Sequence, residues 1–502
     1  MRNLLALFIF SFSFITTSYT QDCPDGEIRL TSQEAIDSFP FKYPDCTRIN
    51  ERLYVVESVS GNIKNLDSLY RVEVIDGNVW ISYNSALKNF SGLHNVDSIY
   101  GRFQIWENAS MIDATGLDDL EYIGSLVAFR DNESLESLEG LEGLTKINGM
   151  LDVTNNNSLK NLKGLDNVDT ITGFFQVNYN DSLINFQGLN KLKFSGGNFH
   201  IQWNDLLESL EGFDSLEELD FNLSIVDNPR LDNLKGLENL KSIGSTISLS
   251  TGNLVNLEGI EQLDTIYGLQ IRNQSTLISL EALSNLKYMK GSLSIYNTPF
   301  LQSLKGLENV TRINGFLRFE DNFFLEDISA LKNVQAINGD LSIQNNDNLK
   351  SLDGLENIDY TTIVRNTFAD GPDIQIFDNK ILTQCDIETI CRFITDEGVG
   401  TYDIRDNAEG CSTGNEVLNS CLTSSNDNVY LDDILFYPNP VIEVLNIDAP
   451  QRGVLYIRDL TGQVLRQVKV DQGSNSISLI DIEAGMYLVQ IDNSRVYKII
   501  KA

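Results

Sequence analysis

The side chains best suited to binding chemistry in this sequence are a few aromatic residues that stand among amides. Aromatic rings offer flat apolar area to a sugar ring or a protein partner, and amides add directional hydrogen bonds. Tyr179 precedes Trp203 by 24 residues, and His200 and Gln202 stand just before Trp203. The candidate ligand-binding residues are Trp80, Trp106, Tyr179, His200, Gln202 and Trp203.

The sequence offers less evidence for catalysis than for ligand binding. Glu107 and Asp131 are 24 residues apart, and a repeat of that length would set them about 5 Å apart, the carboxylate spacing of a retaining glycosidase. Two histidines in the whole chain argue against a His-based metal site or a Ser/His/Asp triad. The sequence also lacks G-x-S-x-G, H-E-x-x-H and phosphate-loop patterns. We therefore expect a protein that is not an enzyme, with no metal and no cofactor.

The charge balance narrows the choice of partners. The chain has 502 residues, with Lys+Arg 37 against Asp+Glu 71, which gives a formal net charge of −34. Nucleic acid and anionic membranes attract basic surfaces, so neither is an expected partner. Hydrophobic residues make up 42% of the chain, which is typical of a folded protein.

The elements that position the aromatic residues come from an internal repeat of 24 residues. Its pattern is I-x-G-x-L-x-I-x-x-N-x-x-L-x-x-L-x-G-L-x-x-L-x-x, and its best copies start at Ile147 and Ile337. Twelve copies follow one another from Ile75, after a looser copy that starts at Ile49, and the copies at Ile243 and Ile266 are one residue short. A single copy cannot bury its apolar face alone, so the copies must stack.

Within each copy the L-x-I segment alternates at the strand period, so one face points inward and the other outward. This places Trp80, Trp106 and His200 on the outward face, and Trp203 just beyond the strand. Stacking copies about 4.8 Å apart sets Tyr179 beside Trp203. The Asn at the tenth position recurs from Asn84 to Asn346 and is expected to form a structural ladder, because Asn tolerates a left-handed backbone and bonds turn peptides.

The repeat resembles leucine-rich repeats and, more closely, receptor L domains over residues 23–421. This resemblance implies an all-β, right-handed parallel solenoid of about thirteen coils with disulfide-stapled caps. The boundaries expected are an N-terminal cap at 21–48, the solenoid at 49–373 and a C-terminal cap at 374–421.

The six cysteines all flank the repeats, which favours disulfides in the caps over zinc or redox chemistry. A helix from Ser32 to Phe39, capped by Ser32, is expected in the N-terminal cap. Two degenerate coils and a helix within 386–394 are expected in the C-terminal cap. We favour three pairs, Cys23–Cys46, Cys385–Cys411 and Cys391–Cys421, because the helix would hold Cys385 and Cys391 too far apart for a bond.

Residues 1–20 have the features of a secretory signal peptide. A basic start precedes an apolar run from Leu4 to Ile15, and small residues fit a cleavage before Gln21. The run is too short to span a membrane, and no later stretch reaches the roughly 20 apolar residues that a spanning helix needs. An exported chain without a transmembrane span is expected.

After a polar linker at 422–429, residues 430–502 show strand alternations and turn pairs typical of a small antiparallel β-sandwich. Four short motifs there resemble the type A sorting domain of type IX secretion. The resemblance implies export through that translocon, removal of the module by a sortase-like peptidase, and a place outside a Gram-negative cell. The residues that carry this sorting signal are Tyr437, Pro438, Asn439, Pro440, Gly462, Gly485, Tyr487, Lys498 and Lys501.

These expectations favour a secreted or cell-surface bacterial adhesion protein whose solenoid face recognises an extracellular glycan or protein. The alternative is a structural component of an extracellular matrix or surface layer. A polysaccharide-cleaving enzyme is the weakest hypothesis.

Overall fold

The computed structural model describes residues 23–364, 371–396, 399–424, 435–437, 440–449, 452–492 and 497–502. The expected signal peptide, residues 425–429 of the expected linker, and Pro438 and Asn439 lie outside these residues. The chain divides into two compact units, residues 1–417 and 418–502, and each is described by itself.

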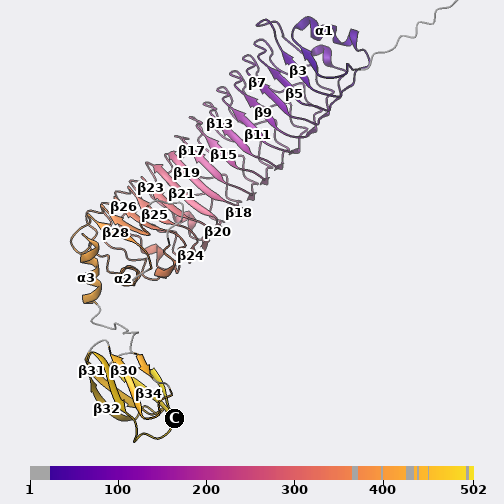
Figure 1. Ribbon diagram of the computed structural model, residues 1–502. Helices are drawn as coiled ribbons and strands as arrows, with labels where there is room; N and C mark the ends of the chain where they lie inside the picture. Colours follow the sequence, from indigo (N-terminus) through magenta and orange to yellow (C-terminus); the bar gives the residue numbers. More distant parts are fainter. Residues whose placement is uncertain are drawn as a thin grey trace, which may run out of the picture. The chain divides into compact units, whose positions relative to one another are not determined.

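The first unit is a solenoid built on one parallel sheet of sixteen strands that follow one another in chain order (Figure 1). Thirteen strands come from the thirteen copies of the repeat, one from the N-terminal cap and two from the C-terminal cap. The strands are β1 (Ile28–Leu30), β3 (Leu53–Val56), β5 (Val79–Ser82), β7 (Phe103–Trp106), β9 (Val127–Arg130), β11 (Leu151–Thr154), β13 (Phe175–Asn178), β15 (Phe199–Gln202), β17 (Leu223–Val226), β19 (Thr246–Gly252), β21 (Gly268–Gln274), β23 (Leu293–Tyr296), β25 (Leu317–Glu320), β26 (Leu341–Gln344), β27 (Ile374–Phe377) and β28 (Tyr402–Arg405). The all-β solenoid expected from the sequence is confirmed, with β1 as a strand that the repeat did not predict.

A second side of the first twelve repeat coils carries a two-residue strand, and these strands form three shorter parallel sheets. The first holds β2 (Arg48–Ile49), β4 (Val74–Ile75), β6 (Ser98–Ile99) and β8 (Tyr122–Ile123). The second holds β10 (Lys146–Ile147), β12 (Thr170–Ile171), β14 (Phe194–Ser195), β16 (Glu218–Leu219) and β18 (Ser242–Ile243), and the third holds β20 (Thr265–Ile266), β22 (Tyr288–Met289) and β24 (Arg312–Ile313).

The third side of most coils makes its turn at a glycine. Gly164 has φ +107°, and a Cβ there would lie 1.9 Å from the carbonyl oxygen of Leu138 in the preceding coil, so no larger residue fits. Three copies carry Ser68, Ala282 or Ala330 at this position, and there the turn becomes a 3₁₀ helix with negative φ. These helices are η1 (Asp67–Leu69), η2 (Glu281–Leu283) and η3 (Ser329–Leu331).

Buried asparagines connect the coils as a ladder. The amide nitrogen of Asn108 donates to the carbonyl oxygen of Ile81 at 2.9 Å, and its backbone N–H donates to Oδ1 of Asn132 at 3.0 Å. The same contacts recur in most coils, which satisfies turn peptides that water cannot reach. The tenth-position asparagines therefore have the structural role expected for them.

The ladder is interrupted in the coil that the sequence shows to be one residue short. Gly252 stands where Asn is expected, and the next coil supplies Gln274 in place of Asn. The longer Gln274 side chain is almost fully buried and accepts the backbone N–H of Leu254 at 3.2 Å. A longer amide thus replaces the contact that the deletion removes.

The N-terminal end of the solenoid is covered by helix α1 (Gln33–Lys42) and a Cys23–Cys46 disulfide. The Oγ of Ser32 accepts the N–H of Ala35 at 3.2 Å, as an N-cap does. The sequence analysis ended this helix at Phe39, three residues too early. Pro40 lies inside the last turn, and the backbone N–H of Tyr43 still donates to the carbonyl of Phe39.

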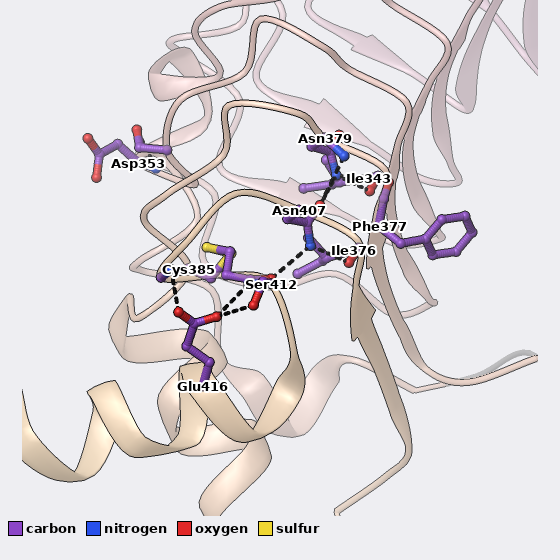
Figure 2. The surroundings of a disulfide bond; sticks show 12 residues. Ile343, Asp353, Ile376, Phe377, Asn379, Cys385, Asn407, Ser412 and Glu416 are labelled. Atoms are coloured by element: carbon purple, nitrogen blue, oxygen red, sulfur yellow. Dashed lines mark hydrogen bonds between the residues drawn. A yellow bond between two sulfur atoms is a disulfide. The ribbon is translucent and has the colours of Figure 1, made fainter.

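The C-terminal end is closed by helices α2 (Glu388–Thr395) and α3 (Gly414–Ser424), with the short helix η4 (Tyr360–Thr362) before them. Figure 2 shows the Cys385–Cys411 disulfide beside the last rung of the ladder, where Asn407 donates to the carbonyl of Ile376 at 2.9 Å. Glu416 accepts backbone N–H groups of Gly410 and Ser412 at 2.7 and 2.9 Å.

Two further features of this cap bear on the sequence analysis. Cys391 and Cys421 are also disulfide-bonded. The linker expected from residue 422 was placed too early, because α3 continues to Ser424. Thr413 caps the start of α3, because its Oγ1 accepts the N–H of Glu416 at 3.2 Å.

The second unit holds two antiparallel sheets over one core. One sheet has the order β29 (Leu435–Tyr437), β30 (Val444–Ala449) and β33 (Gly473–Ser478). The other has the order β32 (Val464–Val470), β31 (Gly453–Arg458), β34 (Gly485–Ile491) and β35 (Tyr497–Lys501). Leu445, Ile457 and Val489 are fully buried in this core, so the antiparallel module expected from the sequence is present.

Candidate functional site

The outward face of the sixteen-stranded sheet presents two rows of side chains in register. Row A runs from Arg29 through Tyr54 and Trp80 to Asp403, and row B runs from Val56 through Trp106 to Arg405. The two rows hold five arginines, at 29, 130, 272, 318 and 405, against three acids, at 152, 320 and 403. Although the chain has a net charge of −34, rows A and B are therefore not acidic.

A third row follows the strands directly. Every coil from β5 to β28 places one non-glycine residue there in the left-handed region, with φ between +49° and +60°. Asn and Asp adopt this conformation readily, whereas a bulky side chain does so at a cost. This row C contains Tyr83, Glu107, Asp131, Asn155, Tyr179, Trp203, Asp227, Thr251, Asn273, Asn297, Asp321, Asn345, Asp378 and Asp406.

The first aromatic group lies over β1 to β9 and is stacked on itself. The Tyr54 and Trp80 rings are 5.8 Å apart and stacked, and Trp80 meets Trp106 edge-on at 4.9 Å. The Arg29 guanidinium covers Tyr54 at 4.4 Å, and that of Arg130 covers Trp106 at 5.4 Å. We call these five residues the N-terminal stack. Its ring faces are occupied by one another and by the two arginines.

A buried carboxylate holds one end of this stack. Asp152 is fully buried, and its Oδ2 accepts the Nε–H of Arg130 at 2.5 Å, while Thr154 donates to its Oδ1 at 2.6 Å. A buried acid is expensive unless it is paired and hydrogen-bonded. This pair therefore fixes the guanidinium over Trp106.

The second aromatic group lies over β13 and β15. The rings of Tyr179 and Trp203 are stacked, with centroids 4.7 Å apart and planes only 7° from parallel, at the separation that the coil spacing predicts. Both residues belong to row C. We call the aromatic–amide patch the six residues that these two coils present outward, Gln176, Asn178, Tyr179, His200, Gln202 and Trp203.

The aromatic–amide patch carries no formal charge at neutral pH. Partial burial lowers the pKa of His200 below its usual value, so the imidazole is neutral there. Gln202 donates to the Oγ of Ser224 at 2.9 Å, and Gln176 donates to the Oγ1 of Thr154 at 3.4 Å. The acceptor oxygens of both amides receive no donor from the described residues.

The structure thus divides the candidate residues predicted from the sequence. Trp80 and Trp106 lie together in the N-terminal stack, and Tyr179, His200, Gln202 and Trp203 lie together in the aromatic–amide patch. Only β11 lies between β9, which carries Arg130 of the stack, and β13 of the patch, and among the described residues no ring of one group contacts a ring of the other.

Sequence analysis missed several members of the N-terminal stack. Arg29 lies on β1, before the first repeat, and Tyr54 lies in the loosest copy, although Leu53-Tyr54-Val55 has the strand alternation that could have found it. Gln104 also lies in row A, where it pairs directly with the large Trp80 and is only 5% exposed.

The two carboxylates considered for catalysis stand side by side in row C but are engaged with neighbours. Glu107 accepts a hydrogen bond from Tyr83, which raises the pKa of that phenol. Asp131 accepts from the amide of Asn155. Both acids therefore take part in the side-chain ladder of row C.

The residues of the expected sorting signal lie on strands and turns of the second unit. Gly462 has φ +89° in the turn between β31 and β32, which Asp459 closes by accepting from Thr461 and Gln463. The hydroxyl of the buried Tyr487 donates to the carbonyl of Glu483 at 2.8 Å. The remaining described positions are Tyr437 at the end of β29, the exposed Pro440, Gly485 at the start of β34, and Lys498 and Lys501 on β35.

Other surface features lie away from the outward face. A hollow of about 620 Å³ beside β6 and β8 is lined by Glu73, Asp97, Asp119 and Glu121. Within the described ranges, no cluster of three His, Cys, Asp or Glu side chains is arranged to hold a metal ion. The described part of the chain contains no helix that is long and apolar enough to span a membrane.

Comparison with known families gives two matches. The Receptor L domain matches residues 311–423, and the Secretion system C-terminal sorting domain matches residues 435–502. No curated protein matches the chain. Both predicted resemblances are confirmed: the last coils and C-terminal cap are similar to a receptor L domain, and the sandwich carries a sorting domain that directs export by type IX secretion.

Proposed function

We propose that this protein is an extracellular binding protein of a Gram-negative bacterium, which recognises a glycan or protein through the outward face of its solenoid and does not alter it chemically. The observation that carries the proposal is the composition of rows A and B. They concentrate Trp, Tyr, Gln and Arg on a chain that is otherwise strongly acidic, and such residues supply most of the binding energy at recognition surfaces.

The sorting domain supports the extracellular part of this proposal. Passage through the type IX translocon brings a folded solenoid outside the cell, and a sortase-like peptidase then removes the C-terminal unit. Deleting residues 435–502 is expected to prevent the protein from reaching the medium or the cell surface, which immunoblots of the culture fractions would detect.

A structural role in an extracellular matrix is the alternative, and it makes a different demand on the surface. A matrix component needs its outward face only for packing, whereas a binding protein needs that face to stay open.

The hydrogen bonds of Glu107 and Asp131 with their neighbours favour binding over glycoside cleavage, because a catalytic pair must face a substrate.

The test introduces charge on the face without disturbing the coil. Ser224→Glu and Ser248→Glu alter two neighbouring row A positions, and Thr145→Glu alters an exposed position outside the strands. The labelled exported protein is titrated onto producing cells and their extracellular material. Loss of binding in the double variant, with normal binding by Thr145→Glu, is expected. Equal binding by all three proteins would contradict the proposed function.

A further inference from the structure

We propose that the aromatic–amide patch is the ligand site of the outward face and that it takes an uncharged, hydroxyl-rich glycan. This inference rests on the proposed function and gives it a place and a ligand class. The N-terminal stack, in contrast, holds the sheet together.

The first argument is the backbone under the two rings. Tyr179 and Trp203 have φ +57° and +55°, in a row where most coils use Asn or Asp. Bulky residues in the left-handed region are rare, and such local strain gathers at binding sites because the surrounding structure sustains it. Folding alone would be served better by Asn at both positions, so another requirement keeps the rings there.

The second argument is hydrogen bonding. Three neighbouring amide oxygens in the patch, Oε1 of Gln176, Oδ1 of Asn178 and Oε1 of Gln202, receive no donor from the described residues. The Asn178 oxygen is also buried, where a missing partner is costly. Because the Asn178 oxygen is closed to a ligand, the acceptors open to one are the Oε1 atoms of Gln176 and Gln202. A ligand that fits them must bring two donors close together, as neighbouring hydroxyls of a sugar do.

The third argument is charge. The six side chains of the patch are neutral at neutral pH, and an anionic ligand would add acceptors to a site that already has unpaired acceptors. It would also approach a chain with net charge −34, whose field repels anions over about a Debye length. These terms favour a neutral glycan over an acidic one.

The N-terminal stack lacks the left-handed backbone and the amide acceptors of the patch. Its rings contact Arg29, Arg130 and one another, so they are already engaged in contacts within the protein. Both arginines are paired with acids, Arg29 with Glu27 and Arg130 with Asp152. The Nε1 of Trp106 is buried without a partner among the described residues, but it is a donor closed to a ligand, whereas the patch offers amide acceptors.

The experiment measures the affinity of the full exported protein for soluble polysaccharides by calorimetry. The neutral probes are dextran, laminarin, mannan and arabinoxylan, and the acidic probes are alginate and polygalacturonate. Variants Trp203→Asn and Tyr179→Asn remove the rings but suit the left-handed backbone, and Gln202→Leu removes one acceptor at similar size. Phe300→Ala is the matched control, because Phe300 is another exposed ring stacked on a neighbour, Phe324, in a different part of the coil.

At least one neutral polysaccharide is expected to bind, with affinity about tenfold lower in Trp203→Asn and in Tyr179→Asn, reduced in Gln202→Leu and unchanged in Phe300→Ala. The melting temperature of the Asn variants should not fall. Failure of every neutral probe to bind, or normal binding by Trp203→Asn, would overturn the inference. If an acidic polymer binds instead and Trp203→Asn abolishes its binding, the ligand class is wrong while the proposed function stands.

Discussion

Two groups of aromatic side chains on the same sheet face differ in the backbone that carries their rings and in the polar groups beside them. In the N-terminal stack, Trp80 and Trp106 contact each other edge-on and contact flanking residues, and a buried acid fixes the terminal arginine. In the aromatic–amide patch, Tyr179 and Trp203 also stack, yet they occupy strained backbone and stand beside unpaired amide oxygens.

The comparison shows that an outward aromatic residue does not by itself mark a binding site. Both groups have tryptophan on the outward side, and both would be selected by counting exposed rings. What separates them is the left-handed backbone under the rings of the patch and the amide acceptors beside them. These differences assign stability to one group and recognition to the other.

The largest effect that would test this contrast is the loss of a tryptophan from the stack. Trp80→Ala removes the ring that contacts both Tyr54 and Trp106, and we expect a loss of about 2 kcal/mol, less than for a fully buried tryptophan. Hydrogen exchange should show weaker protection in β3, β5 and β7. The affinity for ligand should stay within twofold of the unaltered protein. A stable Trp80→Ala protein that no longer binds would reverse the two roles.

A smaller loss is expected when the acid that holds the stack is neutralised. Asp152→Asn keeps the shape but weakens the hold on Arg130, which is partly exposed and so partly screened; we expect about 1–2 kcal/mol. Urea unfolding followed by tryptophan fluorescence measures it, because Trp106 lies under the guanidinium.

The matched variant is Asp340→Asn. Asp340 is almost fully buried and holds Arg318 of the preceding coil at 2.8 Å, over Phe316. It should lose similar stability without any change in the emission of the N-terminal tryptophans. Equal emission changes in both variants would mean that Asp152 does not act through Trp106.

The sequence predicted much of this arrangement because the repeat fixes the register. Identical positions pair in adjacent coils, so Trp80 and Trp106 had to point outward and Tyr179 had to meet Trp203. Arg29 was beyond prediction, since β1 has three residues and precedes the repeat. The left-handed row was also missed, because Tyr179 and Trp203 are poor formers of that conformation, although Asn155 and Asn345 at the same position indicated it.

An intermediate effect, of opposite sign, sets the scale of strain in row C. Thr251 is β-branched, exposed and has φ +49°. Thr251→Asn should stabilise the protein by up to about 1 kcal/mol, because Asn tolerates the left-handed region. Thermal unfolding measures the gain, and Asp227→Asn should show none. If Thr251→Asn is neutral, row C is not strained and the argument from the backbone of Trp203 fails.

The smallest expected effect separates the two groups by pH. Burial lowers the pKa of His200, whereas unfolded histidine has a pKa of about 6.5. Below that pH the unfolded chain takes up a proton that the folded patch resists, so the stability that neutral His200 provides is lost as the pH falls.

The effect should be small because the imidazole is only half-buried and solvent screens its charge. The melting temperature of the unaltered protein should therefore fall more steeply between pH 7 and 5 than that of His200→Gln, since glutamine does not titrate. His94→Gln removes the other histidine, which is exposed, and should follow the unaltered protein. Hydrogen exchange should place the difference in β13 and β15 and leave β5 and β7 unchanged, because the rings of the N-terminal stack carry no group that titrates in this range. A pH-dependent loss centred on β5 and β7 instead would show that the stack, not the patch, is the part of the face that responds to its surroundings.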